Sequence, residues 1–293
     1  MQNTVLFGNG INRLSDDAVS WNDLLDKIKG VNKFENGNLP NTMVYERVFM
    51  EKHIPEHSQK ADEVDIKNTI ADAMKSQGSN EVFEKLVSLD INNYLTTNYD
   101  YAFEKALKIN AQKLSTEDIY SLRRKREYNL NKNVKYLWSI HGEIEHPKSI
   151  MLGLDHYCGS VSKIESYVKG TYKHIVDGKN QSVEPMSTKL KKSSYCFTSW
   201  IDLFFSSNIH IIGLSLDYSE TDIWWLLNKR ARFAADNLVD NKIYFYTNQI
   251  EREKSELLKS FNVEVVNIKV INDDYKSMYM SAISKIKLIS ETV

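Results

Sequence analysis

Cysteine, proline and glycine are all scarce in this sequence. The 293 residues include only two cysteines, four prolines and eleven glycines. Cys158 and Cys196 cannot build a disulfide framework or a cysteine zinc cluster, so we expect a reducing compartment, the cytoplasm. The low glycine and proline content excludes collagen-like and low-complexity chains, and 42% hydrophobic residues are typical of a globular domain with a sizeable core.

Excess charge and long apolar runs are also missing. The 38 Lys and Arg residues nearly balance the 39 Asp and Glu residues, so a dedicated nucleic-acid binder is not expected. The basic run Arg123-Arg124-Lys125-Arg126 is interpreted as a solvated helix face. No stretch of about 18 apolar residues occurs, and the first residues lack the features of a secretory signal. We therefore expect no membrane span and no secretion.

Six short segments rich in β-branched and aromatic residues predict strands. They are 4–7, 93–96, 134–140, 209–212, 243–246 and 263–268. Helical patterns separate them, and both Ser20-Trp21-Asn22-Asp23 and Ser219-Glu220-Thr221-Asp222 have the spacing of a capping box at a helix start. Apolar strands that alternate with capped helices are typical of a parallel sheet covered on both faces. The sequence therefore predicts an α/β fold, a doubly wound Rossmann-like parallel sheet of about six strands.

Two segments interrupt this alternation. Residues from about 31 to 80 are polar and mostly helical in pattern, and residues from about 151 to 194 carry aromatic positions among polar ones. We interpret both as helical insertions in a single domain that spans 1–293. The Rossmann-like core then consists of about 1–30, 81–150 and 195–293. Because ligands bind outside the carboxyl ends of the strands in such sheets, we expect the insertions to roof the pocket.

The first strand runs directly into Gly8-Asn9-Gly10-Ile11-Asn12. Glycines in this turn would let the backbone approach a phosphate and would present N–H groups at a helix N-terminus. A Gly-x-Gly without a third glycine is also compatible with an ordinary strand-to-helix turn. Its position at the first strand–helix junction, where doubly wound folds hold a dinucleotide pyrophosphate, favours the phosphate site.

Polar side chains follow the second and third strands. Asn98 and Asp100 lie just after the second strand, where they could instead cap the next helix. His141 follows the third strand and could be either a hydrogen-bonded core histidine or a general base. Because the carboxyl ends of parallel strands meet at one edge of a sheet, we expect these three side chains to converge.

The fourth and fifth strands add further polar groups at the same edge. Gly213 and Ser215 follow the fourth strand, and Thr247 and Asn248 follow the fifth. Either Thr247 or Asn248 could bond a ribose or phosphate oxygen. The sequence thus predicts a crevice lined by polar residues from several strands.

Four short segments resemble, in order, the motifs of the sirtuin family. Gly8-Asn9-Gly10-Ile11-Asn12 resembles the Gly-Ala-Gly-x-Ser loop, and Thr97-Asn98-Tyr99-Asp100 resembles the Gln-Asn-x-Asp segment. His141-Gly142 resembles the catalytic His-Gly, and Gly213-Leu214-Ser215-Leu216 the Gly-Thr-Ser loop. The sirtuin-like branch of bacterial anti-phage systems has a Trp-x-x-Leu-Leu helix after the first loop, and Trp21-Asn22-Asp23-Leu24-Leu25 is similar to it.

The resemblance implies an NAD hydrolase rather than a protein deacylase. Deacylating sirtuins carry a four-cysteine zinc module and a Gly-Ile-Pro-Asp-Phe-Arg segment, and this sequence has neither. The resembling defence proteins hydrolyse NAD to nicotinamide and ADP-ribose, which depletes the infected cell of NAD and aborts the infection. NAD would be the substrate, and we expect no metal. An ADP-ribosyltransferase, a deacylase of sirtuin type and a non-catalytic module that senses NAD or ADP-ribose are the alternatives.

The resemblance also implies roles for the site residues. Asn98 would position the nicotinamide ribose and the attacking water, while Asp100 would orient the carboxamide or support Asn98. His141 would accept a proton from a ribose hydroxyl or from water. The bond expels a neutral pyridine, so no acid is needed for the leaving group. The residues expected to bind the rest of NAD are Gly8, Asn9, Gly10, Asn12, Thr97, Gly213, Ser215, Thr247 and Asn248.

Control of such an activity is expected to come from outside the protomer. An unrestrained NAD hydrolase would kill its own host, and the sirtuin-like domain nearly fills the 293 residues. We therefore expect a homo-oligomer. The family resemblance further implies a companion ATPase or a phage-derived trigger protein as a partner.

Overall fold

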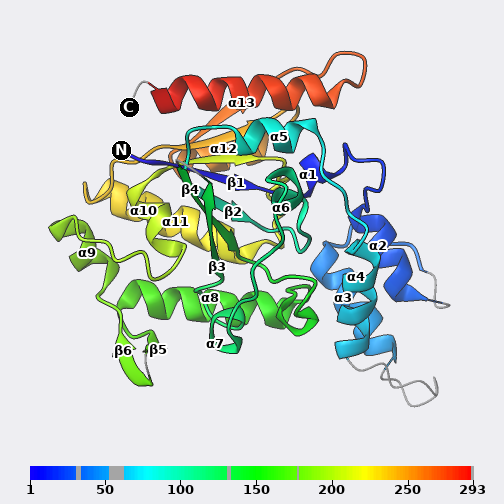
Figure 1. Ribbon diagram of the computed structural model, residues 1–293, viewed down its shortest axis with the longest axis horizontal. Helices are drawn as coiled ribbons and strands as arrows, with labels where there is room; N and C mark the ends of the chain where they lie inside the picture. Colours follow the sequence, from blue (N-terminus) through cyan, green and yellow to red (C-terminus); the bar gives the residue numbers. More distant parts are fainter. Residues whose placement is uncertain (31–33, 53–62, 131–132, 177, 292–293) are drawn as a thin grey trace.

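A seven-stranded sheet runs through the middle of the protein in a computed structural model that describes residues 1–30, 34–52, 63–130, 133–176 and 178–291 (Figure 1). The strands are β1 (Asn3–Phe7), β2 (Asn93–Thr96), β3 (Lys125–Leu130), β4 (Asn133–Ser139), β7 (Asn208–Ile212), β8 (Ile243–Thr247) and β9 (Val263–Asn267). Their order across the sheet is β3-β4-β2-β1-β7-β8-β9. All neighbouring pairs are parallel except β3 with β4, which is antiparallel.

The predicted fold class is confirmed. All six predicted strands are present, and without β3 their order is that of a doubly wound, dinucleotide-binding sheet. From β1 the chain adds β2 and β4 towards one edge of the sheet, and it then returns to β7 and adds β8 and β9 towards the other edge. The point of reversal lies between β1 and β7, which are parallel neighbours with Leu6 opposite Ile211. The crevice above that point is where such folds bind their ligands.

The interpretation of the basic run as a solvated helix face is wrong. Lys125 and Arg126 begin β3, an edge strand. Arg126 is 2% exposed and forms an ion pair with Glu143 at 2.6 Å, and Arg124 is buried as well. A short run of charges does not reveal that a carboxylate seventeen residues further along will neutralise it, and this pairing is what allows the guanidinium to be buried.

Helices cover both faces of the sheet (Figure 1). One face carries α8 (Leu154–Lys169), α9 (Met186–Lys192), α10 (Ile201–Ser206), α11 (Thr221–Ala235) and α12 (Arg252–Ser260). The other face carries α5 (Glu81–Val87), α6 (Ala102–Ala106) and α13 (Tyr275–Glu291). Successive residues of β1 alternate between the two cores, with Leu6 in the first and Val5 and Phe7 in the second. The short elements α1 (Asn9–Asn12), α7 (Thr116–Ile119) and η1 (Pro147–Ser149) lie in the connections.

A third group of helices packs at the end of the sheet to which β1 and β2 point (Figure 1). It consists of α2 (Trp21–Lys29), α3 (Asn41–Lys52) and α4 (Glu63–Met74), with a core of its own that includes Tyr99 and Ile150. The predicted capping box of α2 is confirmed, because the Asp23 N–H donates to Ser20 Oγ at 3.1 Å and the Ser20 N–H donates to Asp23 Oδ2 at 3.0 Å. Residues 31–33 and 53–62 of the predicted first insertion lie outside the described residues.

The second interrupting segment joins the core of the sheet. Its long helix α8 contributes Ile164 and Tyr167 to the same cluster as Leu6 of β1. The segment also contains a hairpin of β5 (Lys173–Val176) and β6 (Lys179–Ser182), which the sequence pattern does not predict. None of the helices in the described ranges is long and apolar enough to cross a membrane.

The predicted capping box at Ser219 is wrong. Helix α11 begins at Thr221, and its N-cap residue Glu220 makes no capping hydrogen bond through its side chain. Ser219 Oγ donates instead to Asp217 Oδ1 at 2.6 Å. The Asp222 side chain contacts His141, far away in the sequence, and therefore does not take part in a capping box.

Candidate active site

A cavity of about 980 Å³ opens at the carboxyl edge of the sheet, next to the loops that follow β1 and β7. Its volume is in the range of natural small-molecule sites. The sequence-predicted residues that line it are Asn9, Gly10, Thr97, Asn98, His141, Gly213, Ser215, Thr247 and Asn248. Each interrupting segment also contributes to the lining, through Met74 of α4 and Tyr157 of α8. The nine predicted residues come from five separated stretches of chain that meet at one edge of the sheet.

Asn98 is held in place by a series of hydrogen-bonded side chains that leads away from the cavity. Its Nδ2 donates to Asn12 Oδ1 at 3.1 Å, and Asn12 Nδ2 donates in turn to Asp100 Oδ2 at 2.6 Å. Asn12 is fully buried and Asp100 nearly so, and both lie behind the lining. The other Asp100 oxygen accepts from the Ala102 N–H at 2.8 Å. With its amide nitrogen fixed in this way, Asn98 keeps its Oδ1 as a hydrogen-bond acceptor.

Asp100 therefore acts on the site through Asn12. Burial raises the pKa of Asp100, although the hydrogen bonds from the Ala102 N–H and from Asn12 oppose this effect. Of the two roles predicted for Asp100, the geometry favours support of Asn98, because Asp100 is not among the lining residues. Asn12 likewise supports Asn98 instead of facing a ligand directly.

His141 is paired with a carboxylate that the sequence analysis did not select. Its Nε2 lies 3.1 Å from Asp222 Oδ2, and the two side chains are 2% and 0% exposed. Asp222 also accepts from Ser160 Oγ at 3.0 Å and from the Ile223 N–H at 2.9 Å. Burial alone would raise the pKa of Asp222, but His141 and these hydrogen bonds outweigh it, so its pKa lies below the usual value.

This contact determines which nitrogen of His141 can act as a base. A carboxylate oxygen only accepts hydrogen bonds, so Nε2 carries the proton and the neutral ring keeps its lone pair on Nδ1. The ring of Tyr157 packs edge-on against the imidazole, with the ring centres 5.4 Å apart. An imidazole that is oriented by a buried aspartate is a common arrangement for a general base. In the sequence, Asp222 stands out only as the last residue of the Ser219–Asp222 segment that is interpreted as a helix start.

The glycines of the first loop pack against the loop that follows β7. The Gly8 N–H donates to the Ile212 carbonyl at 3.1 Å, and the Gly10 N–H donates to the Gly213 carbonyl at 2.8 Å. These two N–H groups are therefore engaged within the protein, and a role of the loop in binding a diphosphate stays a prediction. A Cβ on Gly8 or Gly10 would lie under 3 Å from the Gly213 carbonyl oxygen. The glycines are needed because the loops after β1 and β7 pack directly on each other.

Two cationic side chains line the cavity close to these loops, and sequence reasoning missed both. Arg13, one residue after the predicted loop, is exposed and makes no ion pair with any residue that the structure describes. Lys254 of α12 donates to the Ser215 carbonyl at 2.7 Å. These two side chains would supply the positive charge that balances a diphosphate bound in this cavity. At the outer end, Thr247 Oγ1 donates to the Gln249 carbonyl at 2.8 Å, and Asn248 lies beside it in the lining.

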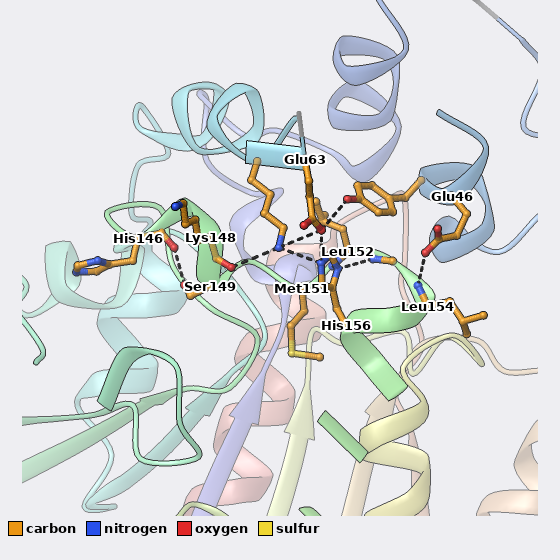
Figure 2. A network of polar contacts seen from close by, with 12 residues as sticks. Glu46, Glu63, His146, Lys148, Ser149, Met151, Leu152, Leu154 and His156 are labelled. Atoms are coloured by element: carbon orange, nitrogen blue, oxygen red, sulfur yellow. Dashed lines mark hydrogen bonds and ion pairs between the residues drawn. The ribbon is translucent and has the colours of Figure 1, made fainter. Parts of the chain in front are cut away.

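A polar network connects α3 and α4 to the start of α8 (Figure 2). His156 Nδ1 accepts from the N–H groups of Leu152 and Gly153 at 3.0 and 2.9 Å, which caps the start of α8. His156 Nε2 lies 2.5 Å from Glu63 Oε1 and 2.9 Å from Lys67 Nζ of α4. Because Tyr157 follows His156 directly, this network positions the aromatic ring that contacts His141.

No group of three or more His, Cys, Asp or Glu side chains in the described ranges is arranged to hold a metal ion. Comparison with protein families shows a match of the SIR2-like domain to residues 92–266, more than half of the chain. The matched region includes Asn98, His141, Asp222 and Gly213, and the predicted resemblance to a sirtuin-like domain is confirmed. SIR2-like domains use NAD, which supports a role in NAD binding or processing. No curated protein matches the sequence.

Proposed function

We propose that this chain, which belongs to the SIR2-like domain family, hydrolyses NAD to nicotinamide and ADP-ribose in the cavity at the carboxyl edge of its sheet. The observation that carries the proposal is the convergence of two supported side chains. Asn98 is held by Asn12, and His141 is held by Asp222, although 81 residues separate the last two in the chain. Such support shells are expected for groups that must be placed precisely on a reacting atom.

The chemistry follows from these groups. Water adds to the ribose carbon that bears nicotinamide, and the carbon–nitrogen bond breaks with its electron pair moving to the positively charged ring. Nicotinamide leaves as a neutral molecule, so no acid is required. Nδ1 of His141 accepts the proton of the attacking water, and Asp222 stabilises the imidazolium that forms. Asn98 Oδ1 accepts a hydrogen bond from the ribose or from the water.

The rest of NAD is assigned to the lining around this centre. Arg13 and Lys254 supply positive charge for the diphosphate. Gly10, which packs tightly on Gly213, has no side chain to keep the diphosphate away from the backbone. Ser215 lies beside the diphosphate, with Thr247 or Asn248 near the adenosine. Thr97 and Asn9 complete the wall on the side of β1 and β2.

The biological setting that we propose is NAD depletion in bacterial anti-phage defence, in the cytoplasm. Its support is the resemblance of the first loop and of Trp21-Asn22-Asp23-Leu24-Leu25 to that branch of the sirtuin-like proteins. Within this setting the chain is a homo-oligomer whose activity depends on a companion protein or a phage-derived trigger. Light scattering over a dilution series, run beside turnover measurements, tests the assembly. A monomer with constant specific activity and no response to a partner would contradict it.

The activity is tested by incubating each oligomeric fraction of the purified protein with NAD. The release of nicotinamide is measured by chromatography of the reaction mixture. We expect nicotinamide and ADP-ribose in equal amounts from the wild type and neither from the His141→Ala or Asn98→Ala variants. ADP-ribose bound covalently to protein, in place of free ADP-ribose, would identify a transferase. If no fraction released nicotinamide, with or without infected-cell extract, the proposed function would be wrong.

A further inference from the structure

One carboxylate of the cavity has no role in the mechanism above. Glu220, the N-cap residue of α11, lines the cavity. The residue is partly buried, but its Oε2 atom is buried and has no hydrogen-bond partner among the described residues. Buried polar atoms in native proteins nearly always have a partner, so an unpaired carboxylate oxygen in a ligand cavity needs an explanation.

The neighbours of Glu220 make it costly for this carboxyl group to be charged. Burial has the largest effect and, together with the charges of Asp222 and Asp217, raises the pKa of Glu220 to about 8, although Lys254 and a backbone hydrogen bond from Asp217 oppose this effect. The other titratable groups that face it are the phenols of Tyr99 and Tyr157, whose pKa values are raised chiefly by burial and further by the charge of Glu220. At neutral pH Glu220 is therefore mostly protonated.

Glu220 belongs to the part of the cavity that surrounds His141. It lies two residues before Asp222, the partner of His141, and its charge acts on Tyr157, which packs against the same imidazole. Asp222 is satisfied by His141, Ser160 and a backbone N–H, and Asp217 is satisfied by Ser219. Glu220 is the carboxylate of this group that is left to receive a positive charge from a ligand.

We propose that Glu220 is a specificity-determining residue whose carboxylate pairs with the positively charged nicotinamide ring, so that the cavity prefers oxidised NAD over the reduced form. The inference rests on the proposed function, because it assumes that NAD is the ligand. The reduced dinucleotide has the same shape and the same diphosphate, but its dihydronicotinamide ring is neutral. A buried carboxylate is thus a physical means of distinguishing the two.

The pairing also requires a proton to leave. When the cationic ring enters, it stabilises the ionised form of Glu220, and the proton passes to the solvent. From a pKa of about 8, most of the carboxyl groups are protonated at pH 7. Binding of a cationic ring should then release up to about 0.9 of a proton per molecule at that pH. A neutral ring gives no reason for this release.

The experiment measures binding by calorimetry at pH 7, in buffers of different ionisation enthalpy. The probes are carba-NAD, which keeps the cationic ring but cannot be hydrolysed, reduced NAD and ADP-ribose. For the wild type we expect carba-NAD to bind about tenfold or more tightly than reduced NAD, with proton release. In Glu220→Gln we expect this preference to fall to within about twofold and the proton release to disappear. ADP-ribose should bind both proteins equally.

Glu253→Gln is the matched control, since Glu253 is an exposed glutamate of α12 outside the cavity lining. It should retain both the preference and the proton release. A thermal unfolding curve confirms that Glu220→Gln is folded. Equal preference and equal proton release in wild type and Glu220→Gln would overturn the assignment of Glu220 while leaving the proposed function intact. If none of the three probes bound the wild type, the proposed function would fall together with this inference.

Discussion

His141 and His210 are both buried histidines, one beyond the end of a strand of the central sheet and one within a strand, and their surroundings differ in kind. His141 follows the end of β4, lines the cavity and contacts the carboxylate of Asp222. His210 lies in the middle of β7, fully buried, and its ring is stacked on Tyr244 with the ring centres 5.1 Å apart. Its Nδ1 lies 3.1 Å from the hydroxyl of Tyr246, and its Nε2 lies 3.0 Å from Asn3 Oδ1.

The difference shows how position along a strand decides what a histidine does. In mid-strand both ring nitrogens of His210 have neutral partners, and burial lowers its pKa to about 4. It is a structural residue. At the strand end, one nitrogen of His141 faces a carboxylate and the ring borders a cavity, so proton transfer to a ligand becomes possible. The predictions below test this division, beginning with the largest effect.

Removal of the His141 side chain should abolish turnover without unfolding the protein. We expect His141→Ala to lower the rate of nicotinamide release by about 10²-fold or more, the usual contribution of a general base. Because the residue lies at the edge of the core, the midpoint of thermal unfolding should change little. The measurement is a progress curve of NAD consumption beside a melting curve, and undiminished turnover in a folded variant would show that His141 is not the base.

Neutralising its partner should have a smaller effect of the same kind. In Asp222→Asn, the amide can no longer stabilise an imidazolium, and we expect turnover to fall by about 10- to 100-fold. Ser160→Ala removes one hydrogen bond from Asp222 but leaves the His141 contact, so it is the matched control and should cost only a few-fold. Equal rates for the wild type and Asp222→Asn would mean that the contact with His141 is structural.

His210 should affect stability and not catalysis. Its pKa is about 4 in the folded protein and about 6.5 in the unfolded chain, so the folded state binds fewer protons between these values. The stabilising contribution is therefore present above pH 6.5 and is lost as the pH falls towards 4, by about 3 kcal/mol at most. Denaturant unfolding should show that the free energy of unfolding of His210→Phe falls less than that of the wild type between pH 6.5 and 4. An identical pH dependence in both proteins would contradict the assignment.

Glu220 should affect stability in the opposite direction, and by less. Its pKa of about 8 lies above that of an unfolded glutamate, so the folded state binds more protons between about pH 4.5 and 8. The contribution is fully present below pH 4.5 and is lost as the pH rises through 8. We expect Glu220→Gln to be more stable than the wild type at pH 8 by about 1 to 2 kcal/mol, since partial exposure screens the charge. A less stable variant would show that the carboxylate holds the fold together.

The predicted parts of the fold depend on local patterns. The apolar strands and the Ser20–Asp23 capping box were visible because each is encoded within a few consecutive residues. The incorrect predictions concern residues whose partners are distant. The sequence places Arg126 in solvent because its partner Glu143 belongs to another segment. It places Ser219 at a helix cap because no neighbouring residue indicates that Asp222 contacts His141.

The sequence by itself determined a doubly wound sheet with polar residues at the ends of its strands, because hydrophobic periodicity is a local property and Asn98, Asp100 and His141 each come directly after a predicted strand. Only the tertiary structure decided how these residues are supported. Asn12 joins Asn98 to Asp100, and Asp222 meets His141, because helices α1 and α11 start at the same edge of the sheet. Contacts of this kind depend on how whole helices pack against strands, and no local sequence pattern predicts which distant side chains will meet.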